Sequence, residues 1–268
     1  MTTEKQRRQA AQRHLQKQLE RRAQQTARRR RGLAIGATVV SVLVVLGAVL
    51  LLTGVLGGDE PDTSATGTPQ APGTATCTYS PDDSGNPNLT DVGTPPNPAS
   101  TPAEGTTTLL MTTGQGDLTL TLDRAQAPCA AASFTYLAEQ QFFDGSPCHR
   151  MVNGESFGVL QCGDPSGTGQ GGPTYKYAEE VTPETTYPRG TIAMANSGRP
   201  GSTGSQFFLV FADAQLSPDY TVVGTVDEAG LAVLDQIAEA GNDGSLEPSP
   251  GGGKPNEPVV IESVTVVS

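Results

Sequence analysis

The chain has 268 residues and a formal net charge of −11, and this charge is distributed very unevenly. Residues 1–31 carry 11 basic and two acidic residues, a net charge of +9, and no charged residue follows until position 59. The rest carries six basic and 26 acidic residues, a net charge of −20. Such an acidic body argues against nucleic-acid binding there, and lipid headgroups explain the basic tail more simply than nucleic acid does.

The uncharged stretch 33–56 consists almost entirely of Val, Leu, Ala, Gly and Ile. A helix of this length would extend roughly 36 Å at ~1.5 Å per residue, enough to cross a ~30 Å hydrocarbon core. We therefore predict a transmembrane anchor over residues 32–56. The run is too long for a secretory signal peptide and no Ala-x-Ala site follows it, so we expect an uncleaved anchor.

The four residues Arg28–Arg31 directly precede this anchor. Because positive residues stay on the cytoplasmic side, residues 1–31 are expected to be a cytoplasmic tail and everything after the anchor to be extracytoplasmic. All four cysteines lie beyond the anchor, where disulfides persist, and they allow three pairings among which the sequence alone does not choose. No Cys-x-x-Cys occurs and His149 is the one histidine on that side, so we expect no metal site.

Residues 57–105 are rich in Pro, Thr, Ser, Gly and Asp, as in the Pro-Pro-Asn-Pro run from position 95. This composition buries too little apolar surface to offset chain entropy, so we predict a disordered, extended linker. Cys77 and Tyr79 suggest that its middle is tied to the folded body. We expect the folded domain to occupy residues 106–268.

Residues 107–113 and 117–123 are β-prone runs separated by Gly-Gln-Gly, which predicts a hairpin. Pro128 suits the first turn of a helix to about position 140, and a second helix fits 231–239. Further strands are expected at 148–152, 159–162, 191–195, 207–211, 221–226 and 259–267. Many short strands with Gly/Pro turns and two isolated helices predict a mainly β domain, an antiparallel barrel with helices at its ends.

Four short motifs stand out within this domain. The sequence reads Cys-His-Arg-Met from position 148, Gln-Cys-Gly-Asp from 161, Met-Ala-Asn-Ser-Gly from 194 and Gly-Ser-Gln-Phe-Phe from 204. In this order and at nearly this spacing they resemble the motifs of the cyclophilins, over residues 107–267. The resemblance implies a closed, eight-stranded antiparallel cyclophilin-like barrel with two capping helices, here in a membrane-anchored bacterial form. It also implies peptidyl-prolyl cis/trans isomerisation of proline-containing polypeptides, without a cofactor.

The resemblance assigns roles to individual residues. Arg150 is expected to be the cationic donor, with Gln161 and Gln206 orienting it and binding substrate carbonyls. Arginine suits this task because it stays charged and presents several fixed N–H groups. Ala195 and Asn196 would hold the peptide backbone. The substrate-binding set is completed by residues expected to line the proline pocket: Phe157, Val159, Phe208, Leu216 and Tyr220.

The chain departs from the family pattern in places. About three extra residues lie between Arg150 and Gln161, within 153–158, so that Phe157 and Val159 are only the closest equivalents of a Phe-Met pair. Tyr220 stands where many members have His, and Gln215 where some have Trp. The resemblance therefore implies less about the binding of cyclosporin-type peptides than about catalysis.

Cys148 and Cys162 flank a predicted hairpin, and we hypothesise that they form one disulfide, which leaves Cys77 to pair with Cys129. The expected function is an isomerase that assists the folding of exported proteins at the cell membrane, since uncatalysed prolyl isomerisation is slow enough to limit folding. The alternative is a membrane-tethered module that binds prolyl peptides, or acts as a chaperone, without catalysis. The insertion after position 153 keeps this alternative open.

Overall fold

A computed structural model of the chain describes residues 72–154 and 157–267. The predicted cytoplasmic tail, the anchor at 32–56 and the first part of the linker lie outside the described residues. Within the described ranges, no helix combines the length and the apolar character needed to cross a bilayer.

The hairpin formed by β5 (Thr106–Thr113) and β6 (Gly116–Asp123) begins the main sheet, as the sequence predicts. Along β6 the leucines Leu118, Leu120 and Leu122 are buried, and the intervening threonines are partly exposed. This alternation follows from the strand period of two, which turns every second side chain toward the core. The predicted hairpin is confirmed.

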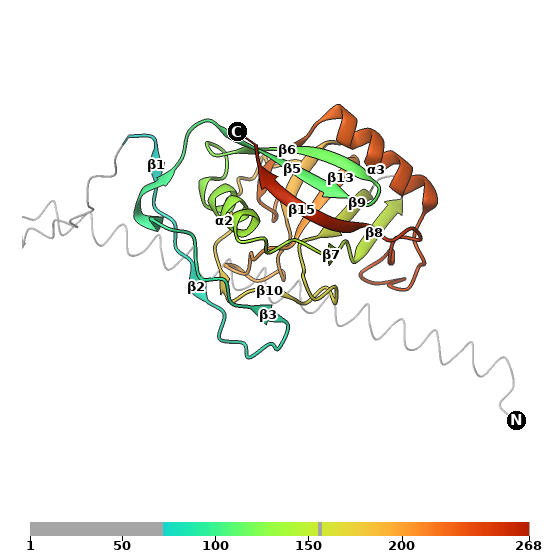
Figure 1. Cartoon of the computed structure of the whole chain (residues 1–268), viewed down its shortest axis with the longest axis horizontal. Coiled ribbons are helices and arrows are strands. Elements are labelled where there is room, and N and C mark those ends of the chain that lie inside the picture. The colour runs from blue at the N-terminus through green and yellow to red at the C-terminus, as the bar shows by residue number, and fades with distance from the viewer. Residues whose placement is uncertain (1–71, 155–156, 268) are drawn as a thin grey trace, which may run out of the picture. The chain divides into compact units, whose positions relative to one another are not determined.

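The main sheet has nine strands in the order β7-β15-β5-β6-β14-β12-β13-β9-β8, and it curls around an apolar core (Figure 1). Its remaining strands are β7 (Ser146–Pro147), β8 (Arg150–Gly154), β9 (Phe157–Cys162), β12 (Thr191–Met194), β13 (Phe207–Ala212), β14 (Val222–Val226) and β15 (Val260–Val266). All of its ladders are antiparallel.

The closed, eight-stranded barrel expected from the resemblance needs correction. In the part of the chain that the structure describes, the two edge strands β7 and β8 are not neighbours, so the curled sheet does not close through them. β7 has only two residues and pairs with β15 alone. At the other edge Met151 of β8 forms an isolated bridge with Gly253, so an irregular segment covers the edge where a strand would close the ring.

Two helices pack against this sheet, as predicted. Helix α2 (Pro128–Glu139) has Pro at its first position and lies against β15, whereas α3 (Glu228–Ala240) lies against β6. Helix α3 begins three residues before the predicted start, because the Asp227 carboxylate accepts a hydrogen bond from the Gly230 N–H and caps the helix there.

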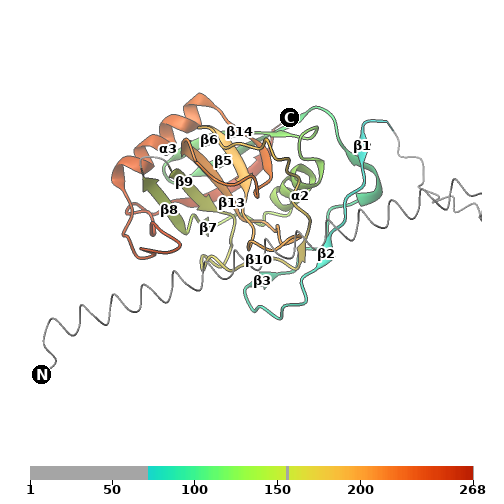
Figure 2. The ribbon, with the colours of Figure 1, turned by 180° about the vertical axis from the view of Figure 1, so that it is seen from behind.

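The predicted disordered linker is wrong for residues 72–105, which lie along the folded body (Figure 2). This part contains β1 (Thr74–Ala75), β2 (Ser80–Pro81), β3 (Leu89–Thr90), a 3₁₀ turn at Pro98–Ser100 and β4 (Thr101–Pro102). The strand β2 pairs with β11 (Tyr175–Lys176), and β3 pairs with β10 (Gly172–Pro173).

Composition misleads here because backbone pairing and a few anchors hold the segment, rather than apolar burial. The ring of Tyr79 meets those of Tyr175 and Tyr177 edge-on, at centroid distances of 5.4 and 5.6 Å, and its hydroxyl donates to the Cys129 carbonyl at 2.9 Å. Disulfides join Cys77 to Cys129 and Cys148 to Cys162, the pairing that was hypothesised.

The Cys77–Cys129 disulfide links residues 52 positions apart, so it restricts the unfolded chain strongly. Replacing both with serine is expected to lower the free energy of unfolding by about 2–4 kcal/mol. Urea unfolding of the full-length chain, followed by circular dichroism, measures this change. An unchanged unfolding midpoint would mean that Tyr79 and the short strands hold the segment without the covalent bond.

Candidate functional site

A cavity of about 420 Å³ opens beside the edge strand β8 and its neighbour β9. Arg150 and Gln161 line it, together with Ala195, Asn196 and all five residues predicted to form the proline pocket. Gln206 instead lines an adjoining cavity of about 530 Å³, whose wall also includes Gln161, Ala195 and Asn196. Asp82, Asn86 and Leu89 of the 72–105 segment contribute to this second cavity.

Strand register brings the central residues together. Arg150 of β8 lies opposite Gln161 of β9, and Gln161 lies opposite Phe208 of β13. Residues directly opposite each other in a sheet share one face, so these three side chains form a row across the strands. Phe207 points the other way into the main core, as predicted, and packs against Phe134. The row therefore lies on the face away from that core.

A chain of hydrogen bonds runs from this row into the second cavity. Arg150 Nη1 donates to Gln161 Oε1 at 3.1 Å, and Gln161 Nε2 donates to Gln206 Oε1 at 3.0 Å. Gln206 Nε2 then donates to the Gly171 carbonyl at 3.0 Å. Each amide uses its oxygen toward the previous donor and its NH₂ toward the next acceptor, so the orientation of every group is fixed.

Two further acceptors hold the guanidinium of Arg150, and the sequence analysis did not anticipate them. Nε donates to the Gly251 carbonyl at 3.0 Å, and Nη2 donates to the Pro250 carbonyl at 2.9 Å. Partial burial lowers the pKa of Arg150, and the proximity of Tyr220 and Glu247 opposes this shift. Arginine nevertheless remains a cation at neutral pH.

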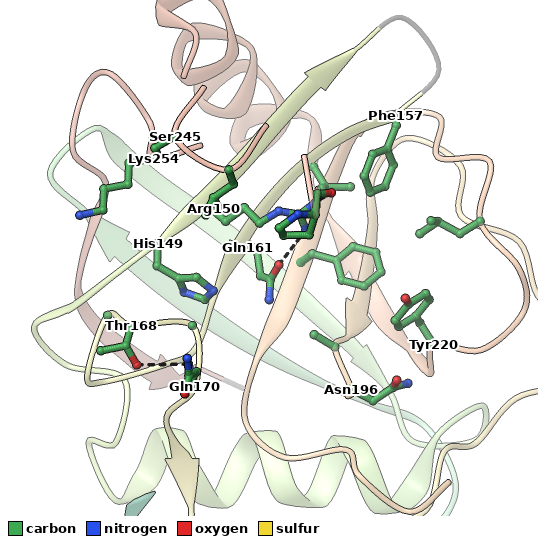
Figure 3. A pocket seen from close by; sticks show the side chains of 18 residues that line it. His149, Arg150, Phe157, Gln161, Thr168, Gln170, Asn196, Tyr220, Ser245 and Lys254 are labelled. Carbon is green, nitrogen blue, oxygen red and sulfur yellow. Dashed lines mark hydrogen bonds between the residues drawn. The ribbon is translucent and has the colours of Figure 1, made fainter. Parts of the chain in front are cut away.

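The apolar end of the cavity belongs to a small cluster separate from the main core. Phe208 is buried, and its ring meets that of Tyr220 edge-on at a centroid distance of 5.5 Å. Val159 is buried as well, whereas Phe157 and Leu216 are half-buried at the rim. In Figure 3, Phe157 and Tyr220 lie on one side of Arg150 and Gln161, with His149 and Lys254 on the other.

Tyr187 supports this cluster and was missed by the sequence analysis. Its hydroxyl donates to the Tyr220 carbonyl and accepts from the Tyr220 N–H, both at 2.9 Å. Asn196 is similarly tied to the same loop, since its Nδ2 donates to the Asp219 carbonyl at 2.8 Å. The Ala195 N–H is also engaged, since it donates to the Gln206 carbonyl at 2.8 Å. Among the described residues, the Ala195 carbonyl and the main chain of Asn196 are the groups left at this position to meet a peptide.

The insertion after Asn153 leaves the site in place. The β8–β9 pairing continues in register to Gly154 and Phe157, so the extra residues lengthen the hairpin rather than displace it. Both Phe157 and Val159 line the cavity. At the other end of the hairpin, the Cys148–Cys162 disulfide joins the residue two positions before β8 to the last residue of β9, with their Cα atoms 4.0 Å apart.

The cavity-lining residues that the sequence analysis missed lie mainly in two segments, residues 167–170 and the segment between α3 and β15, where Leu246 and Pro250 line the cavity. One signal was available for the second segment. Nineteen positions separate Ala240 and Val260, and a loop this long inside a compact domain usually has a function. Its Gly- and Pro-rich sequence, however, gives no indication of which strand it covers.

Comparison with known proteins gives a consistent result. The family model described as cyclophilin type peptidyl-prolyl cis-trans isomerase matches residues 108–266. A probable peptidyl-prolyl cis-trans isomerase B of Mycobacterium leprae is 44% identical over 183 residues, which cover 63% of this chain and 60% of that protein. Peptidyl-prolyl cis-trans isomerase A of Mycobacterium tuberculosis is 35% identical over 60% of this chain and 92% of its own length.

Among solved structures, a cyclophilin type isomerase of Cryptosporidium parvum, crystallised in the presence of the dipeptide Ala-Pro, is similar with a TM-score of 0.52. It is 28% identical, and the match covers 60% of this chain and 99% of that structure. The present chain spans 60% of the length of the Mycobacterium leprae protein.

His149, beside Arg150, provides a test of the electrostatics of the site. Burial lowers its pKa below the ordinary 6.5, as does the nearby Arg150 charge, while Asp164 acts in the opposite direction. The unfolded chain therefore binds a proton before the folded chain does, and stability should fall as the pH decreases through about 6.5. NMR titration of the imidazole should give a pKa below 6.5, and Arg150→Ala should raise it. A value at or above 6.5 would contradict the burial of this ring.

Proposed function

The chain belongs to the cyclophilin-type peptidyl-prolyl cis-trans isomerase family, and from this membership and its site we propose that it isomerises X-Pro bonds in polypeptides. The observation that carries the proposal is the placement of Arg150. Its cationic guanidinium is held by the amide of Gln161 and lines the same cavity as the apolar cluster around Phe208. A cation beside an apolar slot for a ring is what this reaction needs.

The chemistry explains why one cation suffices. The barrier to rotation arises because the nitrogen lone pair is shared with the carbonyl, at ~18–20 kcal/mol for a peptide bond. A donor aimed at the prolyl nitrogen draws the lone pair out of this resonance and so favours the twisted state. Because that interaction is strongest when the bond is twisted, it lowers the barrier rather than merely binding the substrate. No bond is made or broken, and no nucleophile is needed.

The remaining residues of the site would bind different parts of the peptide. Phe208, Val159, Leu216 and Tyr220 would receive the prolyl ring, with Phe157 at the rim. Gln161 and Gln206 form the hydrogen-bonded chain that orients Arg150 and would bind substrate carbonyls. The main chain at Ala195 and Asn196 lies between the two cavities and would pair with the extended peptide.

We propose further that the enzyme is anchored in the cell membrane through residues 32–56 and acts on exported, proline-containing proteins as they fold. The apolar run and the four arginines before it support this arrangement. Two disulfides, which persist in oxidising compartments, also support an extracytoplasmic domain.

The proposed location predicts a specific pattern of protease sensitivity. In intact spheroplasts of cells that produce the chain, added protease should digest residues 72–268 while residues 1–31 stay protected. Epitope tags at the two ends, read by immunoblot after membrane fractionation, would report both halves. A chain found entirely in the soluble cytoplasmic fraction would overturn the proposed anchor and leave the isomerase proposal unaffected.

Arg150→Ala should lower kcat/KM for a short X-Pro peptide by roughly 100-fold or more, as the loss of one preorganised donor typically does. NMR exchange spectroscopy on the full-length chain in mild detergent measures cis/trans interconversion directly. Arg124→Ala is a matched control, because this arginine lines neither of the two cavities. If the folded wild type binds the peptide without accelerating its exchange, the protein is a binding module instead.

A further inference from the structure

The segment 242–256, called here the edge loop, connects α3 toward β15 and lies beside β8 in both views of the molecule (Figures 1 and 2). It pairs with β8 immediately next to Arg150. The Met151 N–H donates to the Gly253 carbonyl at 2.7 Å, and the Gly253 N–H donates to the Met151 carbonyl at 3.1 Å. These reciprocal bonds fix the register of the edge loop against β8, the strand that carries Arg150.

The edge loop supplies two of the three acceptors that hold the guanidinium, namely the carbonyls of Pro250 and Gly251. A guanidinium has five N–H groups, and three are used in the bonds to these carbonyls and to Gln161. Within the described residues, one N–H on each terminal nitrogen is then left for a substrate. The edge loop therefore determines which direction the free N–H groups of Arg150 face.

Internal hydrogen bonds brace the edge loop. The Glu247 carboxylate accepts from the Gly252 N–H at 2.6 Å, and the Asp243 carboxylate accepts from the N–H groups of Ser245 at 2.9 Å and Lys254 at 2.8 Å. Two backbone bonds between Leu246 and the glycines at 251 and 252 add to these. The loop thus has a defined shape before any peptide arrives.

We propose that the edge loop is a positioning element of the active site, which sets the orientation of Arg150 through the carbonyls of Pro250 and Gly251. The proposal rests on the proposed isomerase function and extends it to a segment outside the four sequence motifs. The donor lowers the rotational barrier of the X-Pro bond only while it is aimed at the prolyl nitrogen. A guanidinium that could turn freely would spend less time in that direction.

The edge loop contains two glycines that form a matched pair for a test. At Gly252, with φ +74°, an added Cβ would lie 2.0 Å from the Met151 carbonyl oxygen, so the loop would have to leave β8. At Gly244, with φ +63°, an added Cβ would meet no atom within 4 Å. Alanine causes a similar backbone strain at both positions, because both have a positive φ. At position 252 it also disrupts the pairing of the edge loop with β8.

The experiment compares Gly252→Ala with Gly244→Ala in the full-length chain. We expect Gly252→Ala to lower kcat/KM for an X-Pro peptide roughly tenfold, while its Kd for the peptide changes less than about twofold. Hydrogen exchange of the Arg150 Nε–H, followed by NMR without peptide, should become faster. Gly244→Ala should match the wild type in all three measurements.

A second pair tests the brace without adding a Cβ clash. Glu247→Ala removes the acceptor for the Gly252 N–H and should lower kcat/KM as Gly252→Ala does. Glu247→Gln keeps an acceptor oxygen there and should retain the wild-type kcat/KM. Equal losses in the two Glu247 variants would show an effect of charge instead. Wild-type catalysis in Gly252→Ala, despite faster Nε–H exchange, would overturn the positioning role alone. A wild-type chain without isomerase activity would overturn the proposed function itself.

Discussion

The site depends on holding a partly buried cation with neutral acceptors. Arg150 donates to a side-chain amide and two backbone carbonyls, and no ion pair of Arg150 is found among the described residues. A carboxylate in direct contact would satisfy the guanidinium more fully, but it would also compete with the substrate for the charge. Neutral acceptors orient the group and leave most of its field available. Burial, which lowers the pKa of Arg150, is the cost of this arrangement.

This constraint explains why the strands around Arg150 are fixed so firmly. A cation held by three bonds keeps its direction only if all three acceptors stay in place. Gln161 is held by strand register and by Gln206, and the disulfide between Cys148 and Cys162 links the two sides of the same hairpin. Phe208 completes the row from the third strand. Rotational freedom is therefore removed from the Arg150 guanidinium before any peptide arrives, which is the physical content of preorganisation.

The sequence predicted the regular parts of this structure because their signals are local. Two β-prone runs on either side of Gly-Gln-Gly marked the β5–β6 hairpin, Pro128 marked the start of α2, and Arg150, Gln161 and Phe208 fell on predicted strands that the structure shows to adjoin. Cys77 and Tyr79 indicated that residues 72–105 are tied to the folded body, and both contacts are present. The short strand pairings of this segment could not be predicted in this way, because they join positions far apart in sequence. The contacts of the edge loop with β8 are equally non-local. Its glycines have no side chains that could indicate which strand the loop contacts.

The open edge of the sheet has a direct consequence for Arg150. In a regular strand successive carbonyls point in opposite directions within the sheet, so a strand paired to β8 could direct only one of two neighbouring carbonyls at the same side chain. The edge loop departs from that geometry at Gly251, where φ is +95°, a value that favours glycine. Two consecutive carbonyls, those of Pro250 and Gly251, consequently reach one guanidinium. An irregular segment at this edge does what a closing strand could not.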